Sequence, residues 1–153
     1  MLDASLCVSV LVLNGHFYYH AYINRNFTSA VTIASNQVIS GLTAHLITVT
    51  SFVEFIFVAS CLGTSWLGMS DSTKEGNWTI VTGPEVGLVA PYLIWSKGEP
   101  NGSTTENCMD YGYGGFRDVS CSLNRTVAVE FECNVTYPAT DMSSCSCTFL
   151  KAR

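Results

Sequence analysis

The 153-residue sequence predicts an α+β domain, and three features of it support that prediction. Two runs rich in β-branched and aromatic residues flank Asn14-Gly15, a pair typical of a tight hairpin turn. Two apolar stretches with helical spacing follow, each behind a capping residue. A long segment rich in Gly, Ser, Thr and Pro then leads into a run of alternating polarity. We therefore expect two helices with small antiparallel sheets.

The N-terminal residues predict a β-hairpin over Val8–Leu13 and His16–Tyr22. The first 13 residues hold an apolar run but no positively charged start, and they include Asp3. This pattern favours a strand over a signal peptide, and a chain cut from a longer precursor.

The helical segments have recognisable starts and ends. Asn26 precedes apolar positions 27, 30, 31, 34 and 38, which predicts a helix over Thr28–Val38 that Gly41 ends. Ser51 and Glu54 form a capping-box pattern, and Phe52, Phe55, Ile56 and Ala59 are expected to line one face of a second helix that stops before Gly63.

The strands of the second half surround a long loop. Trp66, Leu67 and Met69 predict a central buried strand. The segment from Ser70 to Phe116 shows little periodicity, and a loop of that length in a compact domain is usually functional. Gly112–Gly115 predicts a turn, and the alternation over residues 127–132 predicts a half-exposed strand.

Composition restricts the classes of function. A net charge of -5 without a basic cluster argues against nucleic acid or an anionic membrane surface as partner, and Glu54 interrupts the best apolar run short of a membrane span. Seven cysteines and five glycosylation acceptors indicate the secretory pathway. The acceptors are Asn26, Asn77, Asn101, Asn124 and Asn134. The sequence has no Cys-Xaa-Xaa-Cys pair, and its three histidines are scattered in the first third, so a zinc site is not expected.

Oxygen-bearing side chains gather in and after the stretch from Trp95 to Cys108. Glu99 and Asn101 flank Pro100, and Glu106 and Asp118 follow. Hard cations such as Ca²⁺ take six to eight oxygen ligands from carboxylates and amides, so these four residues form a candidate metal site. A solvated acidic loop is the alternative.

The same stretch resembles the long-loop calcium site of C-type lectin domains. The resemblance is carried by Glu99-Pro-Asn, Glu106-Asn-Cys and Phe116-Arg-Asp-Val-Ser-Cys121, and upstream by Trp66-Leu-Gly-Met-Ser-Asp71, Glu75-Gly-Asn-Trp78 and Val81-Thr-Gly-Pro84. It covers roughly residues 12–133. We accordingly expect a C-type lectin-like domain over 12–133, an N-terminal strand or upstream remnant at 1–11, and a Cys-containing tail or further module at 134–153.

The resemblance implies a set of roles. Glu99, Asn101, Glu106 and Asp118 would bind Ca²⁺ and the ligand, with Pro100 cis and Cys108 bonded to Cys121. Asp71, Glu75 and Asn107, with Glu106, would form a second Ca²⁺ site, which is incomplete because Gly102 stands where an acid is often found. The remaining five cysteines make an odd number, so at least one is free or pairs outside the chain.

Arg117 departs from the family pattern, which has an Asn ligand at that position. Either its side chain points away and a weakened Ca²⁺ site persists, or its guanidinium pairs with Glu99 and Glu106 in place of the ion.

The resemblance, through its Glu-Pro-Asn motif, implies a Ca²⁺-dependent module that binds mannose-, glucose- or fucose-type sugars. The acceptor sequences predict glycosylation at Asn26, Asn77, Asn124 and Asn134. Such a module would be secreted or belong to an ectodomain. The rival hypothesis is a metal-free interaction or adhesion module of the same fold, and a third is a structural part of a larger ectodomain. The sequence holds no catalytic constellation, so an enzyme is not expected.

Overall fold

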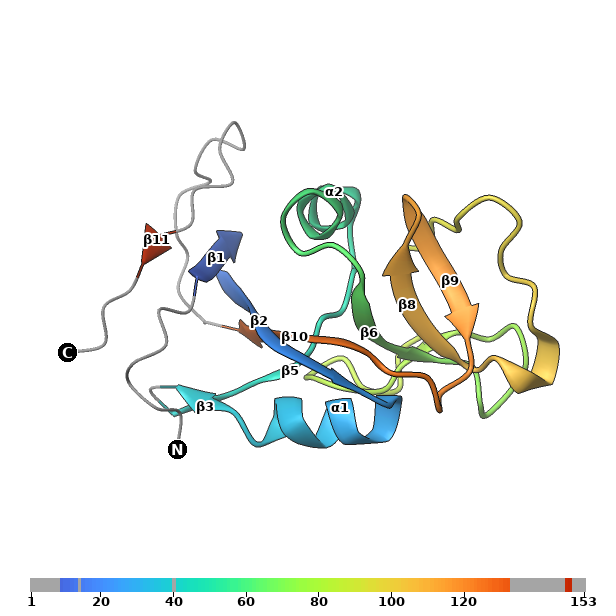
Figure 1. The fold of residues 1–153 in the computed structure, drawn as a ribbon, viewed down its shortest axis with the longest axis horizontal. Coiled ribbons are helices and arrows are strands. Elements are labelled where there is room, and N and C mark those ends of the chain that lie inside the picture. The colour runs from blue at the N-terminus through green and yellow to red at the C-terminus, as the bar shows by residue number, and fades with distance from the viewer. Residues whose placement is uncertain (1–8, 14, 40, 133–147, 150–153) are drawn as a thin grey trace.

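The computed structural model describes residues 9–13, 15–39, 41–132 and 148–149. It confirms the predicted α+β class: two helices lie on opposite sides of a central pair of strands, with a β-hairpin and long loops at one end (Figure 1). The helices are α1, Phe27–Ser35, and α2, Phe52–Cys61. Neither helix, nor any other helix in the described part of the chain, is long and apolar enough to cross a membrane.

The strands form three sheets. The first has the order β11-β1-β2-β10-β5, the second β3-β4 and the third β7-β6-β8-β9. The bounds are β1 Ser9–Leu13, β2 His16–Arg25, β3 Val38–Ile39, β4 Leu42–Thr43, β5 His45–Leu46, β6 Ser65–Ser70, β7 Thr79–Ile80, β8 Cys108–Gly112, β9 Gly115–Val119, β10 Arg125–Glu132 and β11 Thr148–Phe149.

The predicted N-terminal hairpin is present. β1 pairs antiparallel with β2, with Leu13 opposite His16, and Gly15 in the connection has a φ of 87°. The turn requires this left-handed backbone, which glycine adopts without steric cost. β11 also pairs with β1. The predicted division at residues 12 and 133 stays a prediction, since Cys133 and the tail up to 147 lie outside the described residues.

Helix α1 begins as expected and ends early. The Asn26 side chain accepts a hydrogen bond from Ser29 N at 2.9 Å, which satisfies one of the free amides at the helix start. The predicted end at Val38 is wrong: the helix stops at Ser35, and Val38 pairs instead with Thr43 in the β3–β4 hairpin. Gly41 lies in the turn of that hairpin, where its φ is 83°, and does not end the helix.

Helix α2 confirms its predicted bounds but not its predicted face. Ser51 Oγ caps Glu54 N at 3.2 Å, and the helix stops before Gly63. Phe55 and Val58 are buried, whereas Phe52 and Ile56 are exposed. The Glu54 carboxylate takes a core position instead, because it accepts hydrogen bonds from Tyr18 Oη at 2.8 Å and Thr50 N at 2.7 Å.

Two apolar clusters pack on the two sides of the β2–β10 pair. One contains Phe55 and Val58 of α2 with Tyr18 and Ala128, and the other contains residues of α1 with Tyr19 and Val127. The predicted half-exposed strand is therefore wrong. β10 lies between β2 and β5 with a helix on each side, and even Glu130 is fully buried.

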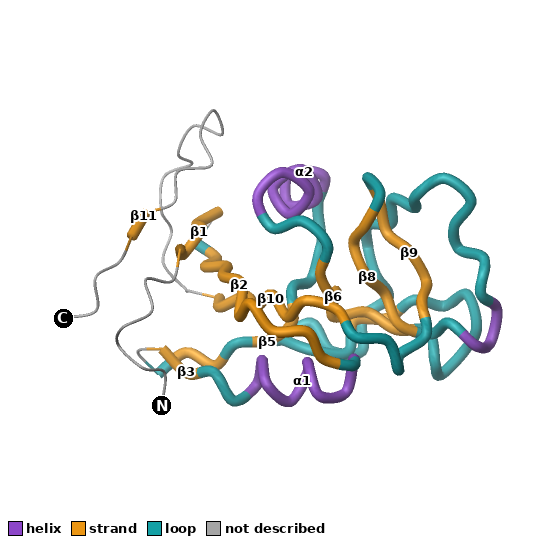
Figure 2. The backbone as a smooth tube through the Cα atoms, in the orientation of Figure 1, coloured by secondary structure: helices purple, strands orange, loops and turns teal. Residues whose placement is uncertain are grey.

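The central strand and the segment after it position the functional loop. All six residues of β6 are buried, as predicted for Trp66, Leu67 and Met69. The segment after Ser70 contains the short strand β7, the 3-10 turn Ser103–Thr105 and the strand β8, which sequence periodicity did not reveal. β8 and β9 join through the predicted turn at Tyr113-Gly114, and the remaining loops extend beside this hairpin (Figure 2).

Candidate functional site

Asp118 on β9 is the anchor of the candidate metal loop. Its carboxylate accepts hydrogen bonds from Asn101 N at 2.9 and 3.0 Å and from Gly102 N at 2.8 Å. The side chain is buried, and the Glu99–Pro100 peptide that precedes Asn101 is cis. The loop is thus fixed to the sheet through backbone amides, and its side chains remain available on the surface.

Glu99 and Glu106 lie beside this anchor. Asn101 Nδ2 donates to Glu99 Oε2 at 2.9 Å. Partial desolvation, the contact with Asp118, and the charges of Asp118 and Glu106 raise the pKa of Glu99 to about 7. A Cβ built on Gly102 would lie 2.0 Å from Glu106 Oε2, so the Glu106 carboxylate occupies the space of a side chain at position 102. The structure therefore brings the four predicted ligands together.

Arg117 does not enter this group. Its guanidinium donates to both oxygens of Asp110, Nε to Oδ1 at 2.8 Å and Nη2 to Oδ2 at 2.7 Å. It also lies over the Tyr113 ring, 4.8 Å from the centroid. The second alternative from the sequence, in which Arg117 pairs with Glu99 and Glu106, is not what the structure shows.

Asp110 is a functional neighbour that sequence reasoning missed. It is fully buried on β8 and is also bonded by Arg125 Nε at 2.6 Å. A lone Asp between the apolar residues Met109 and Tyr111 was the available signal, because a buried carboxylate needs charged or hydrogen-bonding partners. Which arginine supplies them depends on the register across β8 and β9, and this is not readable from one strand.

The second predicted set of ligands lies at the end of β6. Asp71 is buried, and its Oδ2 accepts a hydrogen bond from Gly76 N at 2.8 Å, while its Oδ1 is buried without a hydrogen-bond partner. Glu75 is exposed. Its pKa is raised, mainly by partial desolvation and to a smaller extent by the charges of Asp71 and Asp118. The Asn107 side chain donates to Thr104 O at 3.1 Å.

These residues fit a hard divalent cation. Asp118 and Glu106 lie near enough for their charges to act on Glu99, and within the described residues no Arg, Lys or His forms an ion pair with any of the three. Asp71 Oδ1 is a buried acceptor that lacks a donor. Ca²⁺ would supply the missing positive charge to both sets, and the donors are the oxygens that it prefers.

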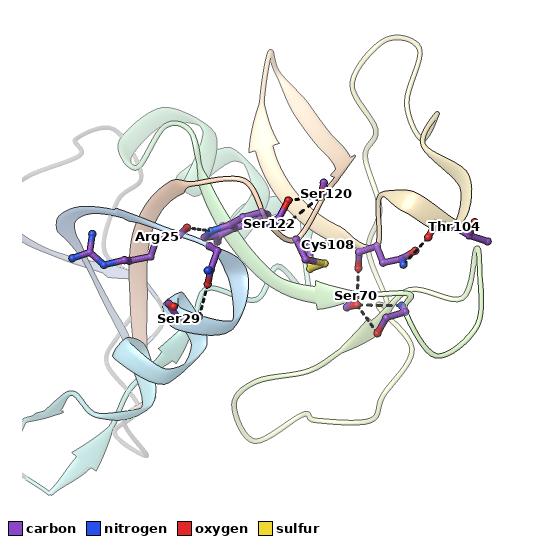
Figure 3. The surroundings of a disulfide bond; sticks show 12 residues. Arg25, Ser29, Ser70, Thr104, Cys108, Ser120 and Ser122 are labelled. Carbon is purple, nitrogen blue, oxygen red and sulfur yellow. Dashed lines mark hydrogen bonds between the residues drawn. A yellow bond between two sulfur atoms is a disulfide. The ribbon is translucent and has the colours of Figure 1, made fainter.

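A disulfide holds the loop at its C-terminal side. Cys108 and Cys121 are bonded, with Cα atoms 5.1 Å apart. Cys121 O also accepts a hydrogen bond from Phe27 N at 3.0 Å, which ties the start of α1 to the bridge. Ser70 lies beside this bridge and donates through Oγ to Asn107 O at 2.6 Å (Figure 3). Cys61 is disulfide-bonded as well, whereas Cys7, Cys133, Cys145 and Cys147 lie outside the described residues.

The fold is that of the C-type lectin-like domains. The human scavenger receptor C-type lectin carbohydrate-recognition domain superposes with a TM-score of 0.70 at 19% identity, over 82% of this chain and 97% of that one. A calcium-independent type II antifreeze protein superposes with a TM-score of 0.68 at 18% identity, over 81% and 92% of the two chains. The predicted C-type lectin-like fold is thus confirmed.

Sequence comparison points to the same class. CD209 antigen-like protein C of Mus musculus is 28% identical over 117 residues, which span 74% of this chain and 62% of that protein. C-type lectin domain family 17, member A of Homo sapiens is 34% identical over 95 residues, or 60% and 24% of the two chains. The chain thus spans less than two thirds of the curated relatives' length. No family model matches it.

Proposed function

We propose that this chain is a C-type lectin domain that binds carbohydrate through Ca²⁺ held by Glu99, Asn101, Glu106 and Asp118. The observation that carries the proposal is the grouping of these residues without an ion pair to any Arg, Lys or His in the described part of the chain. Each sugar binds by placing two neighbouring hydroxyls on the ion, while the side chains around the ion complete the hydrogen bonds. Asp71, Glu75 and Asn107, with Glu106, hold a second ion that orders the loop.

The order of donors and acceptors sets the class of sugar. Glu99 accepts hydrogen bonds only, whereas the Asn101 amide also donates. This order, Glu-Pro-Asn, resembles the form of the family that takes mannose-, glucose- or fucose-type vicinal hydroxyls. Asn101 Nδ2 now donates to Glu99, so ion and sugar binding exchange this internal bond for bonds to the ligand.

Similarity to named proteins supports the proposal. The scavenger receptor structure is described as a carbohydrate-recognition domain, and the human relative is named as a C-type lectin. We propose glycans or glycoproteins as partners, in a secreted protein or a larger ectodomain. The Cys108–Cys121 disulfide fits that oxidising location.

An inhibition assay tests the sugar specificity. The oxidised protein is bound to immobilised mannan in Ca²⁺ buffer and is displaced with free mannose or galactose. Mannose is expected to displace it at lower concentration, and EDTA to release it. The double variant Glu99→Gln, Asn101→Asp reverses the order of donor and acceptor and should favour galactose. Retention on mannan in EDTA would contradict the proposal.

The second candidate function is a metal-free interaction module of the same fold. It is favoured by the likeness to a calcium-independent antifreeze protein, which shows that the fold does not require the ion. The form of this hypothesis in which Arg117 replaces the ion lacks support, because the Arg117 guanidinium is bound to Asp110. A protein whose stability ignores both Ca²⁺ and EDTA would fit this candidate instead.

A further inference from the structure

A second group of ligating side chains lies at the end of the first sheet, remote in sequence from the calcium loop. His16 on β2 is opposite Glu132 on β10, and His45 on β5 is opposite Glu130 on β10. Side chains of directly paired residues project from the same face of a sheet, and residues two apart on one strand share that face. The register therefore places His16, His45, Glu130 and Glu132 on a common face.

Three of these residues, His16, Glu130 and Glu132, have ligating atoms close together, and His45 adjoins one of them, Glu132. One such atom from each of His16, Glu130 and Glu132 lies within 4.8 Å of the other two. His45 Nε2 is 3.5 Å from Glu132 Oε1. His16 Nδ1 contacts Glu130 Oε1 directly, and Glu130 Oε2 accepts a hydrogen bond from Thr48 N at 3.1 Å. The cluster is thus held by the backbone of a neighbouring segment.

His45 is poised as a ligand by its other ring nitrogen. The side chain is 7% exposed, and Nδ1 lies 2.8 Å from Leu46 O. A carbonyl only accepts, so Nδ1 must carry the proton, and Nε2 of the neutral ring presents a lone pair. Nε2 is buried without a hydrogen-bond partner, and so is the oxygen that it faces, Glu132 Oε1. Two acceptors that face one another in this way need a proton or a metal cation between them.

The charges around the group also favour a cation. Glu54 on α2 and Glu85 on the loop after β7 lie near enough for their charges to act on His16 and Glu132 respectively. Glu85 Oε2 is a further buried acceptor without a partner. Acidic groups thus outnumber the two imidazoles, and a bound dication would offset the excess negative charge.

We propose that His16, His45, Glu130 and Glu132 bind a divalent transition metal ion of the zinc class. Two imidazole nitrogens and two carboxylates are ligands that Zn²⁺ commonly takes, and bonds of about 2.0–2.2 Å in a tetrahedron place ligand atoms about 3.4 Å apart. The 3.5 Å separation of His45 Nε2 and Glu132 Oε1 matches that spacing. The ion replaces the proton between His16 Nδ1 and Glu130 Oε1, which passes to solvent.

Spacing along the chain concealed this site. His16 and His45 are 29 positions apart, and no short metal-binding motif joins them. The sheet order β2-β10-β5 brings both next to the acidic end of β10. The sequence-based expectation against zinc considered only linear motifs.

A titration with Zn²⁺ tests the site on the full, tag-free chain with its disulfides intact and Ca²⁺ in excess. Calorimetry is expected to show one Zn²⁺ per chain. His16→Asn and Glu132→Gln are each expected to weaken Zn²⁺ affinity at least tenfold, because each removes one ligand. Both positions are partly exposed, so the fold should tolerate the changes. His20→Gln is the matched control, since it removes the next histidine of the same strand but one outside the ligand group, and it should leave the affinity unchanged.

Co²⁺ provides a second measurement that does not depend on variants. Its visible absorption should have the intensity of a four-coordinate nitrogen and oxygen site and should disappear when Zn²⁺ is added. Absence of Zn²⁺ binding, equal loss in the His20→Gln control, or Co²⁺–thiolate bands that report cysteine ligands would each overturn the proposal.

Discussion

Arg117 and Asp110 face one another across the β8–β9 pair and are joined by two parallel hydrogen bonds of 2.8 and 2.7 Å. This pairing withdraws the guanidinium from Glu99 and Glu106, although Arg117 directly precedes the anchor Asp118. It explains how the chain can carry an arginine where the family resemblance implies a metal ligand and still present an acidic loop. The charge of Arg117 still lowers the pKa of Glu99, although the effects that raise it are larger.

Removal of Asp110 should affect both stability and calcium. Asp110→Ala leaves the guanidinium groups of Arg117 and Arg125 without their carboxylate, and we expect a loss of about 3 kcal/mol in the free energy of unfolding. Arg117 is then free to approach Glu99, so Ca²⁺ affinity should fall as well. Urea unfolding in EDTA and calorimetric Ca²⁺ titration measure the two effects.

A double variant separates the effect on stability from the effect on Ca²⁺ affinity. Arg117→Ala in the Asp110→Ala background should restore Ca²⁺ affinity without restoring full stability. If the affinity of Asp110→Ala equals that of the unaltered protein, Arg117 is not controlled by Asp110.

The missing side chain at position 102 should matter for the ion. Gly102→Ala would place a Cβ 2.0 Å from Glu106 Oε2, which is too close, so the Glu106 carboxylate must move. We expect Ca²⁺ to bind about tenfold more weakly, equivalent to about 1.4 kcal/mol. Thr104→Ala is the control, because Thr104 is exposed and its only recorded bond is through its backbone carbonyl. Equal affinities in the two variants would argue against a role of Glu106.

Several elements were predictable because their signals are local. Asn26 and Ser51 cap the helices that they were predicted to start. The apolar residues 66–69 form the buried strand, and the loop resemblance identified the bonded pair Cys108 and Cys121 and the cis Pro100. Each of these rests on a few neighbouring residues or on a short motif.

The failures concern long-range contacts. β10 alternates in polarity, yet both of its faces are covered, because Glu130 is buried through bonds to His16 and Thr48. In α2, Glu54 takes the place of an apolar residue, because Tyr18 and Thr50 supply its hydrogen bonds. Asp110 is likewise a buried charged residue in an apolar strand, and Arg117 and Arg125 supply its hydrogen bonds. In each case a partner of the buried charged residue lies on another element, and a local sequence pattern does not reveal such a pairing.

Glu54 also makes stability depend on pH. Burial and the charge of Glu130 raise its pKa, so the folded state holds the proton at pH values where the unfolded chain has released it. For such a group, the free energy of unfolding falls as pH rises above the ordinary glutamate pKa of 4.5. Glu54→Gln should flatten this fall, because the amide cannot ionise.

Urea unfolding of the unaltered protein and of Glu54→Gln, in EDTA at pH values from about 4 upward, measures how steeply the stability of each falls with pH. A Glu54→Gln protein whose stability declines with pH as steeply as that of the unaltered protein would show that Glu54 ionises freely in the fold.

Asn101 is both a proposed ligand and the acceptor of an Asn-Gly-Ser glycosylation signal. Its Nδ2 donates to Glu99 Oε2, and a glycan on that nitrogen would block the surface where the sugar is expected to bind. We expect Asn101 to be largely unmodified in protein from a glycosylating host. Asn26, Asn77 and Asn124 are exposed, and occupied sites should be among these and Asn134, which lies outside the described residues. Glycopeptide mass spectrometry decides this, and high occupancy at Asn101 is incompatible with sugar binding in that material.

Calcium-dependent stability is the most direct test of the account. In the unaltered protein, Ca²⁺ at a hundredfold excess over its dissociation constant should raise the free energy of unfolding by about 2.7 kcal/mol, and EDTA should reverse it. Glu99→Gln and Glu106→Gln should each abolish most of the shift, Arg117→Asn should enlarge it at equal Ca²⁺, and Mg²⁺ should produce little because it keeps its water ligands. A denaturation curve that is identical in Ca²⁺ and in EDTA would contradict the proposed metal site.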